Sequence, residues 1–212
     1  MKNSPLKTIF QICLVLTAIC LALSGKPVSA EETRVLFLGD SLTAGLGVKK
    51  EQAFPAVVGR MLKQQGWQDV RIINAGISGA TTAGAVSRLN RQLAAAPHVL
   101  VLALGANDGL RGLSLENMAQ NLDDTISLAL ENNLCVVLAG MEMPPNYGPE
   151  YTGQFRQIFR DLAEKYGIVL IPFLLAHVGG EPDMNQADGI HPNPAGHRQI
   201  AETVLPYILG CL

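Results

Sequence analysis

Residues 34–45 read Arg-Val-Leu-Phe-Leu-Gly-Asp-Ser-Leu-Thr-Ala-Gly, an apolar run that ends in a small polar segment. The run 34–38 predicts a buried strand, because Val, Leu and Phe follow one another without a polar interruption. Ser41 comes where this strand ends, and we expect a short helical turn after it. In an open parallel α/β sheet, ligands bind beyond the carboxyl ends of the strands. This stretch alone leaves two interpretations of Ser41 open, a nucleophile or only the cap of the next helix.

Apolar runs and helical patterns alternate along the rest of the chain. The runs are continuous rather than strictly alternating, as expected for strands that are covered on both faces. Strand–helix alternation at this spacing implies right-handed crossovers and a parallel sheet. We therefore predict an α/β fold, a three-layer α/β/α sandwich with a five-stranded parallel sheet. The expected strands are 34–38, 70–74, 98–104, 134–139 and 168–172, and the expected helices are 54–65, 81–95, 114–131, 153–166 and 194–209.

The first thirty residues have the pattern of a secretory signal peptide. Lys2 and Lys7 precede the apolar run 9–23, and the small residues 28–30 follow it. We predict cleavage after Ala30, which leaves residues 31–212 as a single domain that is periplasmic or secreted and has no stable membrane anchor. A retained anchor and a lipoprotein acylated at Cys20 are the alternatives.

The charge balance argues against a nucleic-acid partner. The whole chain has 16 Lys and Arg against 18 Asp and Glu, and residues 1–30 hold three of the lysines and no acid. The mature domain would therefore carry a net charge of −5 at pH 7. It also lacks a long basic run, so we expect no nucleic acid among its partners.

Two cysteines, Cys135 and Cys211, remain after the predicted cleavage. Export would allow them to pair, but two thiols do not make a disulfide framework, and we expect both to be free. Neither cysteine has the spacing of a metal site. His191 and His197 lie six residues apart, which does not place them on one helix face. We therefore expect no metal.

Polar and glycine residues cluster where predicted strands end. Since the exits of parallel strands share one edge of a sheet, these loops should lie close together. They are 39–41, 74–79, 105–109 and, late in the chain, 188–192.

These loops contain the side chains that a serine esterase needs. Ser41 can supply the nucleophile and His191 the base, and Asp188 lies three residues before His191, so that one turn can present both. The carboxylate would hold one ring nitrogen and leave the other for the serine. For the oxyanion we expect three donors, the Ser41 amide, the Gly76 amide and the Asn107 side-chain amide.

This set resembles the SGNH hydrolases, also called GDSL esterases and lipases, whose four named residues are Ser, Gly, Asn and His. They match Ser41 in Gly-Asp-Ser-Leu, Gly76 in the second loop, Asn107 in Gly-Ala-Asn-Asp and His191 in Asp-Gly-Ile-His-Pro. Asp188 matches the third member of the family's triad. The resemblance covers essentially the whole mature chain and implies a flavodoxin-like strand order.

The resemblance is nearest to the bacterial periplasmic branch with thioesterase, arylesterase and lysophospholipase activities. The segments 107–112 and 145–148 carry it, and Ala106 departs from it where this branch often has glycine. It implies hydrolysis of aryl esters, acyl thioesters and lysophospholipids without a cofactor. We expect a monomer whose partner is a small acyl substrate.

Substrate specificity is expected from the loops. The segment 141–148 forms one wall of the acyl pocket or is only a proline-stiffened connection, and the segment 76–84 has the composition of a mobile lid edge. Asp40 braces its loop, and Arg111 either meets a head group or forms a surface salt bridge. The residues that we assign to substrate binding are Asp40, Asp108, Arg111, Met143, Pro145 and Tyr147.

Two other functions compete with the esterase. A carbohydrate O-deacetylase on the same scaffold would prefer acetyl groups. A non-catalytic protein that binds acyl lipids would keep the cleft without the reaction, and the presence of Ser41, Asp188 and His191 argues against it.

Overall fold

The computed structural model describes residues 32–212. The predicted signal peptide, its cleavage after Ala30 and the alternative acylation at Cys20 all concern residues outside this part. Within residues 32–212, no helix is both long and apolar enough to cross a membrane.

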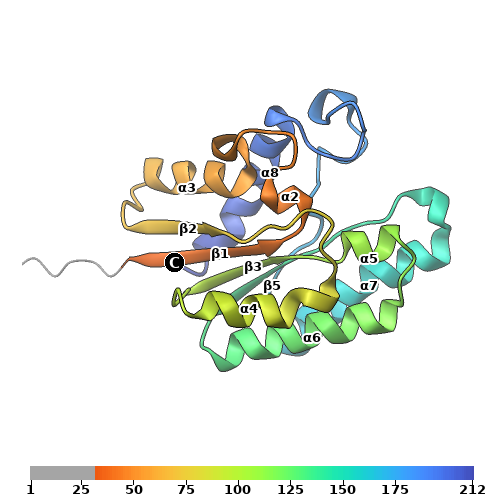
Figure 1. Cartoon of the computed structure of the whole chain (residues 1–212), viewed down its shortest axis with the longest axis horizontal. Helices are drawn as coiled ribbons and strands as arrows, with labels where there is room; N and C mark the ends of the chain where they lie inside the picture. The colour runs from red at the N-terminus through yellow and green to blue at the C-terminus, as the bar shows by residue number, and fades with distance from the viewer. Residues whose placement is uncertain (1–31) are drawn as a thin grey trace, which may run out of the picture. The chain divides into compact units, whose positions relative to one another are not determined.

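Five parallel strands form one sheet, as predicted. Their order is β2-β1-β3-β4-β5, which is the expected flavodoxin-like order (Figure 1). Strands β1, β3 and β4 are central, and the apolar runs of β1 and β3 are fully buried because helices cover both faces. The strands are β1 (Thr33–Gly39), β2 (Val70–Asn74), β3 (Val99–Ala103), β4 (Cys135–Ala139) and β5 (Val169–Ile171).

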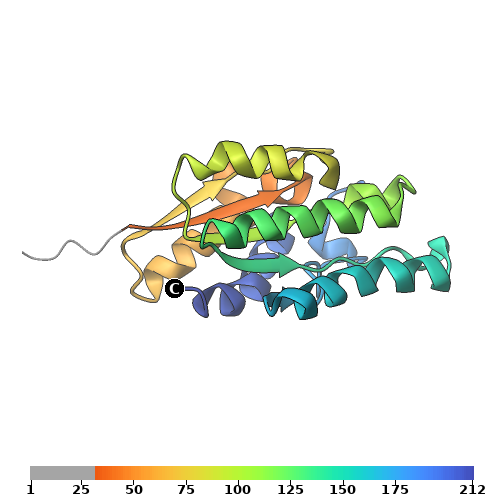
Figure 2. The same ribbon diagram turned by 90° about the horizontal axis from the view of Figure 1, so that it is seen from below.

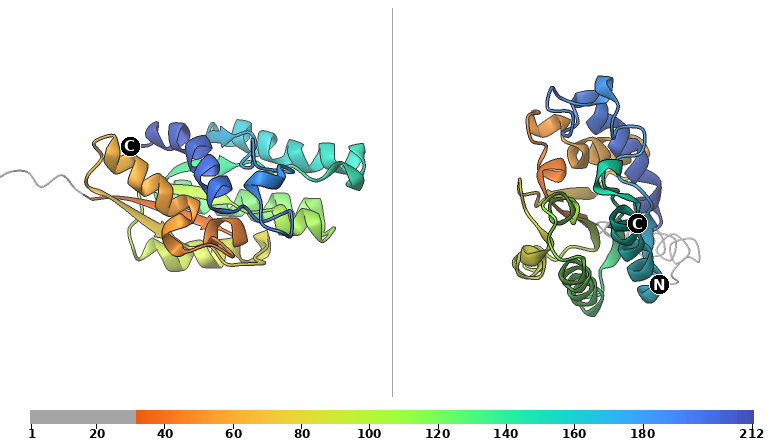
Figure 3. Two further views of the ribbon diagram at one scale, coloured as in Figure 1. Left: turned by 90° about the horizontal axis from the view of Figure 1, so that it is seen from above. Right: turned by 90° about the vertical axis from the view of Figure 1, so that its right-hand side faces the viewer.

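Helices cover the sheet in two layers. On one face, α3 (Phe54–Gln64) packs against α8 (Pro194–Leu209), in front of the sheet in the left view of Figure 3. On the other face, α4 (Ala85–Leu93), α6 (Leu115–Glu131) and α7 (Pro149–Tyr166) run side by side (Figure 2). The short helices are α2 (Ser41–Ala44) and α5 (Ala106–Leu110), with 3-10 turns at Lys50–Gln52, Thr82–Gly84, Pro145–Tyr147 and Pro182–Met184.

Three helices differ from the sequence prediction. The helix expected over 81–95 is a 3-10 turn followed by α4, which begins at Ala85. Helix α7 begins four residues earlier than expected, at Pro149, because proline is preformed for the first helical turn. Residues 106–110, expected as a loop, form α5. Gly105 precedes it at a φ of 115°, a backbone angle that other residues rarely adopt.

Cys135 and Cys211 form a disulfide, so the expectation of two free thiols is wrong. Cys135 begins β4, and Cys211 follows the last helix, α8. Because α8 packs against the sheet, the end of the chain returns to the start of β4 and brings the two Cα atoms within 5.8 Å. That approach is compatible with disulfide geometry. The local sequence pattern could not predict this pairing, because the two cysteines lie 76 residues apart in the chain.

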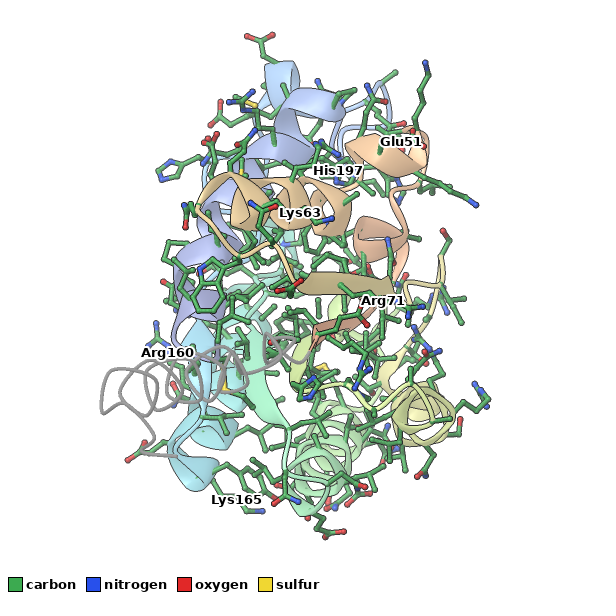
Figure 4. The ribbon with its side chains drawn as sticks, turned by 90° about the vertical axis from the view of Figure 1, so that its left-hand side faces the viewer. Glu51, Lys63, Arg71, Arg160, Lys165 and His197 are labelled. Carbon is green, nitrogen blue, oxygen red and sulfur yellow. A yellow bond between two sulfur atoms is a disulfide. The ribbon has the colours of Figure 1, made fainter. Side chains whose placement is uncertain are left out.

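His197 is buried at the junction of α3 and α8 (Figure 4). Its Nδ1 accepts a hydrogen bond of 3.3 Å from the Phe54 N–H, and its ring stacks on the Phe54 ring. Burial lowers the pKa of His197 to about 4, so the imidazole is neutral at pH 7. His197 therefore joins two helices of the core.

Candidate active site

The carboxyl ends of the strands face the viewer in the right panel of Figure 3. Ser41, Asp188 and His191 come together within hydrogen-bond distance. Ser41 begins α2 directly after β1, while Asp188 and His191 lie in the loop before α8. The Ser41 Oγ is 3.0 Å from the His191 Nε2, and the His191 Nδ1 is 2.7 Å from the Asp188 Oδ2. With Nδ1 protonated toward the carboxylate, Nε2 is free to accept the serine proton.

The turn from Asp188 to His191 is held by the same carboxylate. Its Oδ1 accepts from the backbone N–H groups of Ile190 and His191, each at 3.0 Å. These bonds and the bond to the His191 ring lower the pKa of Asp188 to about 2, so the group is an anion at neutral pH. Gly189 sits in this turn at a φ of 74°, which favours glycine.

Gln186 joins the histidine loop to the serine loop, a link that the sequence analysis did not find. Its Nε2 donates to the carbonyl of Leu46 at 2.7 Å and to that of Pro192 at 2.9 Å, and its N–H donates to the His191 carbonyl. Leu46 follows α2, so Gln186 links the loop that contains His191 to the segment next to Ser41. A glutamine in a polar loop carries no sequence signal for this role.

Asp40 is buried beside the serine, with an exposed fraction of 2%. Its Oδ1 accepts from the Leu42 N–H at 3.0 Å and caps α2, and its Oδ2 accepts from the Asn107 Nδ2 at 3.3 Å. Burial raises the pKa of Asp40 to about 6. Asp40 therefore braces the serine loop, as expected, while also lining the cleft.

Asn107 lies in α5, next to the serine loop. Its Nδ2 donates to the Ala80 carbonyl at 3.0 Å as well as to Asp40. The side-chain amide thus connects the ends of β1 and β3 with the loop that follows β2.

Gly76, whose amide the sequence analysis expected to be an oxyanion donor, is not among the described residues that line the cleft. Its N–H donates to the Asn74 Oδ1 at 2.9 Å, and a Cβ at this position would come within 2.2 Å of the Ala44 backbone nitrogen. Gly76 is needed for the close packing of the β2 exit on α2. Gly79, in the same loop, lines the cleft with a φ of 76°. Within residues 32–212 the Gly79 N–H makes no hydrogen bond.

A cleft of about 580 Å³ opens beside Ser41 and His191. This volume lies in the range of small-molecule sites. Its walls are mostly apolar and come from the loops that follow all five strands. The apolar lining residues are Leu42, Leu46, Ala106, Leu110, Met141, Met143, Pro144, Pro145, Phe173, Leu175 and Ile190.

Met143 and Pro145, assigned to substrate binding from the sequence, line this cleft. Asp108, Arg111 and Tyr147 are not among the described residues that do so.

Those three side chains hold neighbouring loops. The buried Asp108 carboxylate accepts from the N–H and the Oγ1 of Thr82. Arg111 donates to the Gly79 carbonyl at 3.0 Å, and the Tyr147 hydroxyl donates to the Leu110 carbonyl at 2.9 Å. Asp108 and Arg111 therefore fix the loop that follows β2, and Tyr147 fixes α5 against the segment 141–148.

A metal centre has no support in the described part of the chain, where no group of three or more His, Cys, Asp or Glu side chains could hold an ion.

Residues 37–199 match the GDSL-like lipase/acylhydrolase family. The chain is 40% identical over 188 residues to esterase TesA of Pseudomonas aeruginosa. The matched part is 88% of this chain and 93% of that protein. It is also 40% identical over 177 residues to an arylesterase of Vibrio mimicus, covering 83% and 88%. A third relative, the thioesterase 1/protease 1/lysophospholipase L1 of Escherichia coli, is 34% identical over 176 residues, 82% of each chain.

Solved structures are similar over the same part of the chain. The crystal structure of TesA superposes with a TM-score of 0.82 at 39% identity, and covers 85% of this chain and all of that one. The psychrotrophic esterase EstA of Pseudoalteromonas sp., in a structure inhibited by monoethylphosphonate, gives a TM-score of 0.79 at 32% identity and covers 84% and 97%.

Proposed function

Because the chain belongs to the GDSL-like lipase/acylhydrolase family, we propose that it is a serine esterase that hydrolyses carboxylic esters and acyl thioesters. The observation that carries this proposal is the hydrogen-bonded series Ser41–His191–Asp188 beside an apolar cleft. A nucleophile, a base and a group that orients the base are the three elements of serine acyl transfer.

In the first half of the reaction, the Ser41 Oγ attacks the carbonyl carbon of the ester. The His191 Nε2 takes the hydroxyl proton as the carbon–oxygen bond forms. The resulting imidazolium is stabilised by the Asp188 carboxylate, which stays ionised. His191 then returns the proton to the leaving alkoxide or thiolate, and the acyl group remains on Ser41.

In the second half, water replaces the leaving group. His191 takes a proton from water, and the hydroxide attacks the acyl carbon of the Ser41 ester. The tetrahedral intermediate collapses, His191 returns the proton to the Ser41 oxygen, and the carboxylic acid leaves. The enzyme is regenerated without a cofactor.

For the negative charge of each tetrahedral intermediate, we propose three donors. They are the Ser41 N–H, the Gly79 N–H and the Asn107 side-chain amide. The Ser41 and Gly79 amides make no hydrogen bond within residues 32–212, which keeps them available. Asn107 would exchange its bond to Asp40 or Ala80 for one to the oxyanion.

The apolar walls of the cleft support acyl chains rather than sugars as the bound group. Met141 and Met143 are flexible and polarisable, so this wall suits chains of different length. We therefore propose aryl esters, acyl thioesters and lysophospholipids of short to medium acyl length as substrates. The signal-peptide pattern of residues 1–30 supports our proposal that the enzyme acts after export. We also propose that it acts as a monomer.

A panel of p-nitrophenyl esters from acetyl to decanoyl tests the substrate class. We expect kcat/KM to rise from acetyl to a medium chain, because each methylene that is buried adds about 0.8 kcal/mol. The variant Ser41→Ala should lose this hydrolysis and keep its circular dichroism spectrum. A maximum at acetyl would indicate the carbohydrate deacetylase instead, and full activity of Ser41→Ala would overturn the serine mechanism.

A further inference from the structure

Arg88 is a buried arginine that the reaction described above does not use. It lies on α4 with an exposed fraction of 7%. Its Nη2 donates to two backbone carbonyls, that of Gly39 at 2.6 Å and that of Ala75 at 2.5 Å. Hydrogen bonds from a charged donor are stronger than neutral ones, and burial protects them from competition by water.

The two carbonyls lie directly before the loops that hold the proposed oxyanion donors. Gly39 ends β1 and is followed by Asp40 and Ser41, while Ala75 follows β2 and precedes the loop that contains Gly79. The ladder between β1 and β2 ends at the pair Phe37 and Asn74. Beyond that pair the two chain segments need other contacts to stay in register.

Several contacts join the segments beyond the ladder, among them the Asn74 Nδ2, which donates to the Thr43 carbonyl at 2.8 Å, and the packing of Gly76 on α2. Backbone hydrogen bonds run from Ala75 to Phe37 and from Ile77 to Gly39. Arg88 adds a side chain whose single Nη2 nitrogen touches both segments. Because a peptide unit is planar, holding the Gly39 and Ala75 carbonyls also fixes the peptide planes that begin the two loops.

The charge of Arg88 is matched to the same region. Burial lowers the pKa of the guanidinium, and the nearby Asp40 carboxylate opposes this effect. Its second terminal nitrogen, Nη1, is buried and has no hydrogen-bond partner among the described residues. An unpaired buried donor costs free energy, so general stabilisation of the fold is a poor reason for an arginine here.

We propose that Arg88 is a positioning residue, which sets the distance between the Ser41 and Gly79 amides by holding the Gly39 and Ala75 carbonyls with one nitrogen. This inference rests on the proposed function, because it concerns the oxyanion donors of that reaction. Misplacement of such groups by about 1 Å can cost about 100-fold in rate. Loss of Arg88 should therefore lower kcat and change substrate binding little.

The test uses the variants Arg88→Met and Arg88→Lys, with Arg91→Met on the exposed side of α4 as the matched control. Methionine removes both hydrogen bonds, whereas lysine keeps the charge without the guanidinium fork. We expect kcat for p-nitrophenyl butyrate to fall about 10- to 100-fold in Arg88→Met, with KM within threefold of the wild type. Arg88→Lys should fall between the two, and Arg91→Met should match the wild type.

A second readout separates positioning from stability. The rate at which a fluorophosphonate labels Ser41 should fall in parallel with kcat, because the phosphonyl oxygen of the adduct needs the same donors. Both rates are measured at least 15 °C below each variant's melting temperature, and if Arg88→Met does not fold, Arg88→Lys decides. Rates within twofold of the wild type in a folded variant would overturn the role of Arg88. Absence of Ser41-dependent hydrolysis in the wild type would instead overturn the proposed function.

Discussion

The Asp188–His191 pair offers a prediction that separates orientation of the base from its charge. In Asp188→Asn, the side-chain oxygen can still accept from the Ile190 and His191 N–H groups, so the turn is kept. The amide nitrogen would then face the His191 Nδ1 in place of the Oδ2, which lies 2.7 Å away. An amide donates where the carboxylate accepted, so Nδ1 becomes the acceptor and the ring proton moves to Nε2.

A protonated Nε2 cannot take the proton of Ser41. From the corresponding change in another serine hydrolase, we expect kcat to fall about 10⁴-fold at pH 7. Asp188→Ala should fall less, for a reason visible in this structure. The Asp188 side chain is 47% exposed, so water can replace the missing carboxylate and accept from Nδ1.

The assay is hydrolysis of p-nitrophenyl butyrate under single-turnover and steady-state conditions, with circular dichroism as the folding control. KM should change little in both variants, because Asp188 is not among the residues that line the cleft. Equal activity of Asp188→Asn and Asp188→Ala would refute the tautomer argument. A loss below about tenfold in Asp188→Asn would refute the role of Asp188 itself.

Three further predictions concern the disulfide, the oxyanion donors and pH. Cys211→Ser should lower the free energy of unfolding in urea by about 4 kcal/mol, because the disulfide closes a loop with a sequence separation of 76. Reduction of the wild type should give the same loss, and a change below about 1 kcal/mol would contradict this prediction. Asn107→Ala should lower kcat by about 10²–10³, and a loss under threefold would remove Asn107 from the donors. Because the folded pKa of His197 is depressed, stability should fall as pH drops from about 6.5 toward 4, by up to about 3 kcal/mol. In His197→Asn the slope over this range should flatten, and an unchanged slope would contradict the assignment.

The fold was predictable because its central strands are buried on both faces. The sequence of a strand such as β1 or β3 is then a continuous apolar run, and a short polar segment with glycine follows it. Ser41 was accessible to sequence analysis for this reason. Asp188 and His191 lie well beyond the end of β5, in the loop before α8, and were recognised from their spacing of three residues. The structure brings these three together within hydrogen-bond distance.

What could not be predicted depends on tertiary packing. The loop 76–79 has a glycine at each end, and the residue that faces the cleft is decided by the contact of Gly76 with α2 and by its bond to Asn74. The partner of Cys135 depends on where α8 ends in space. Arg88 has the sequence context of an ordinary polar residue on a helix, and only the fold places it under two loops.

The most direct measurement of the central claim is mass spectrometry of the protein after reaction with a fluorophosphonate. Serine attack on phosphorus with loss of fluoride should add one phosphonyl group to the peptide that contains Ser41, and the labelled protein should lose ester hydrolysis in proportion to the label. The variant Ser41→Ala should take up no label, and His191→Ala should be labelled more slowly than the wild type. Labelling of another residue with full loss of activity, or full hydrolysis by protein labelled at Ser41, would contradict the account.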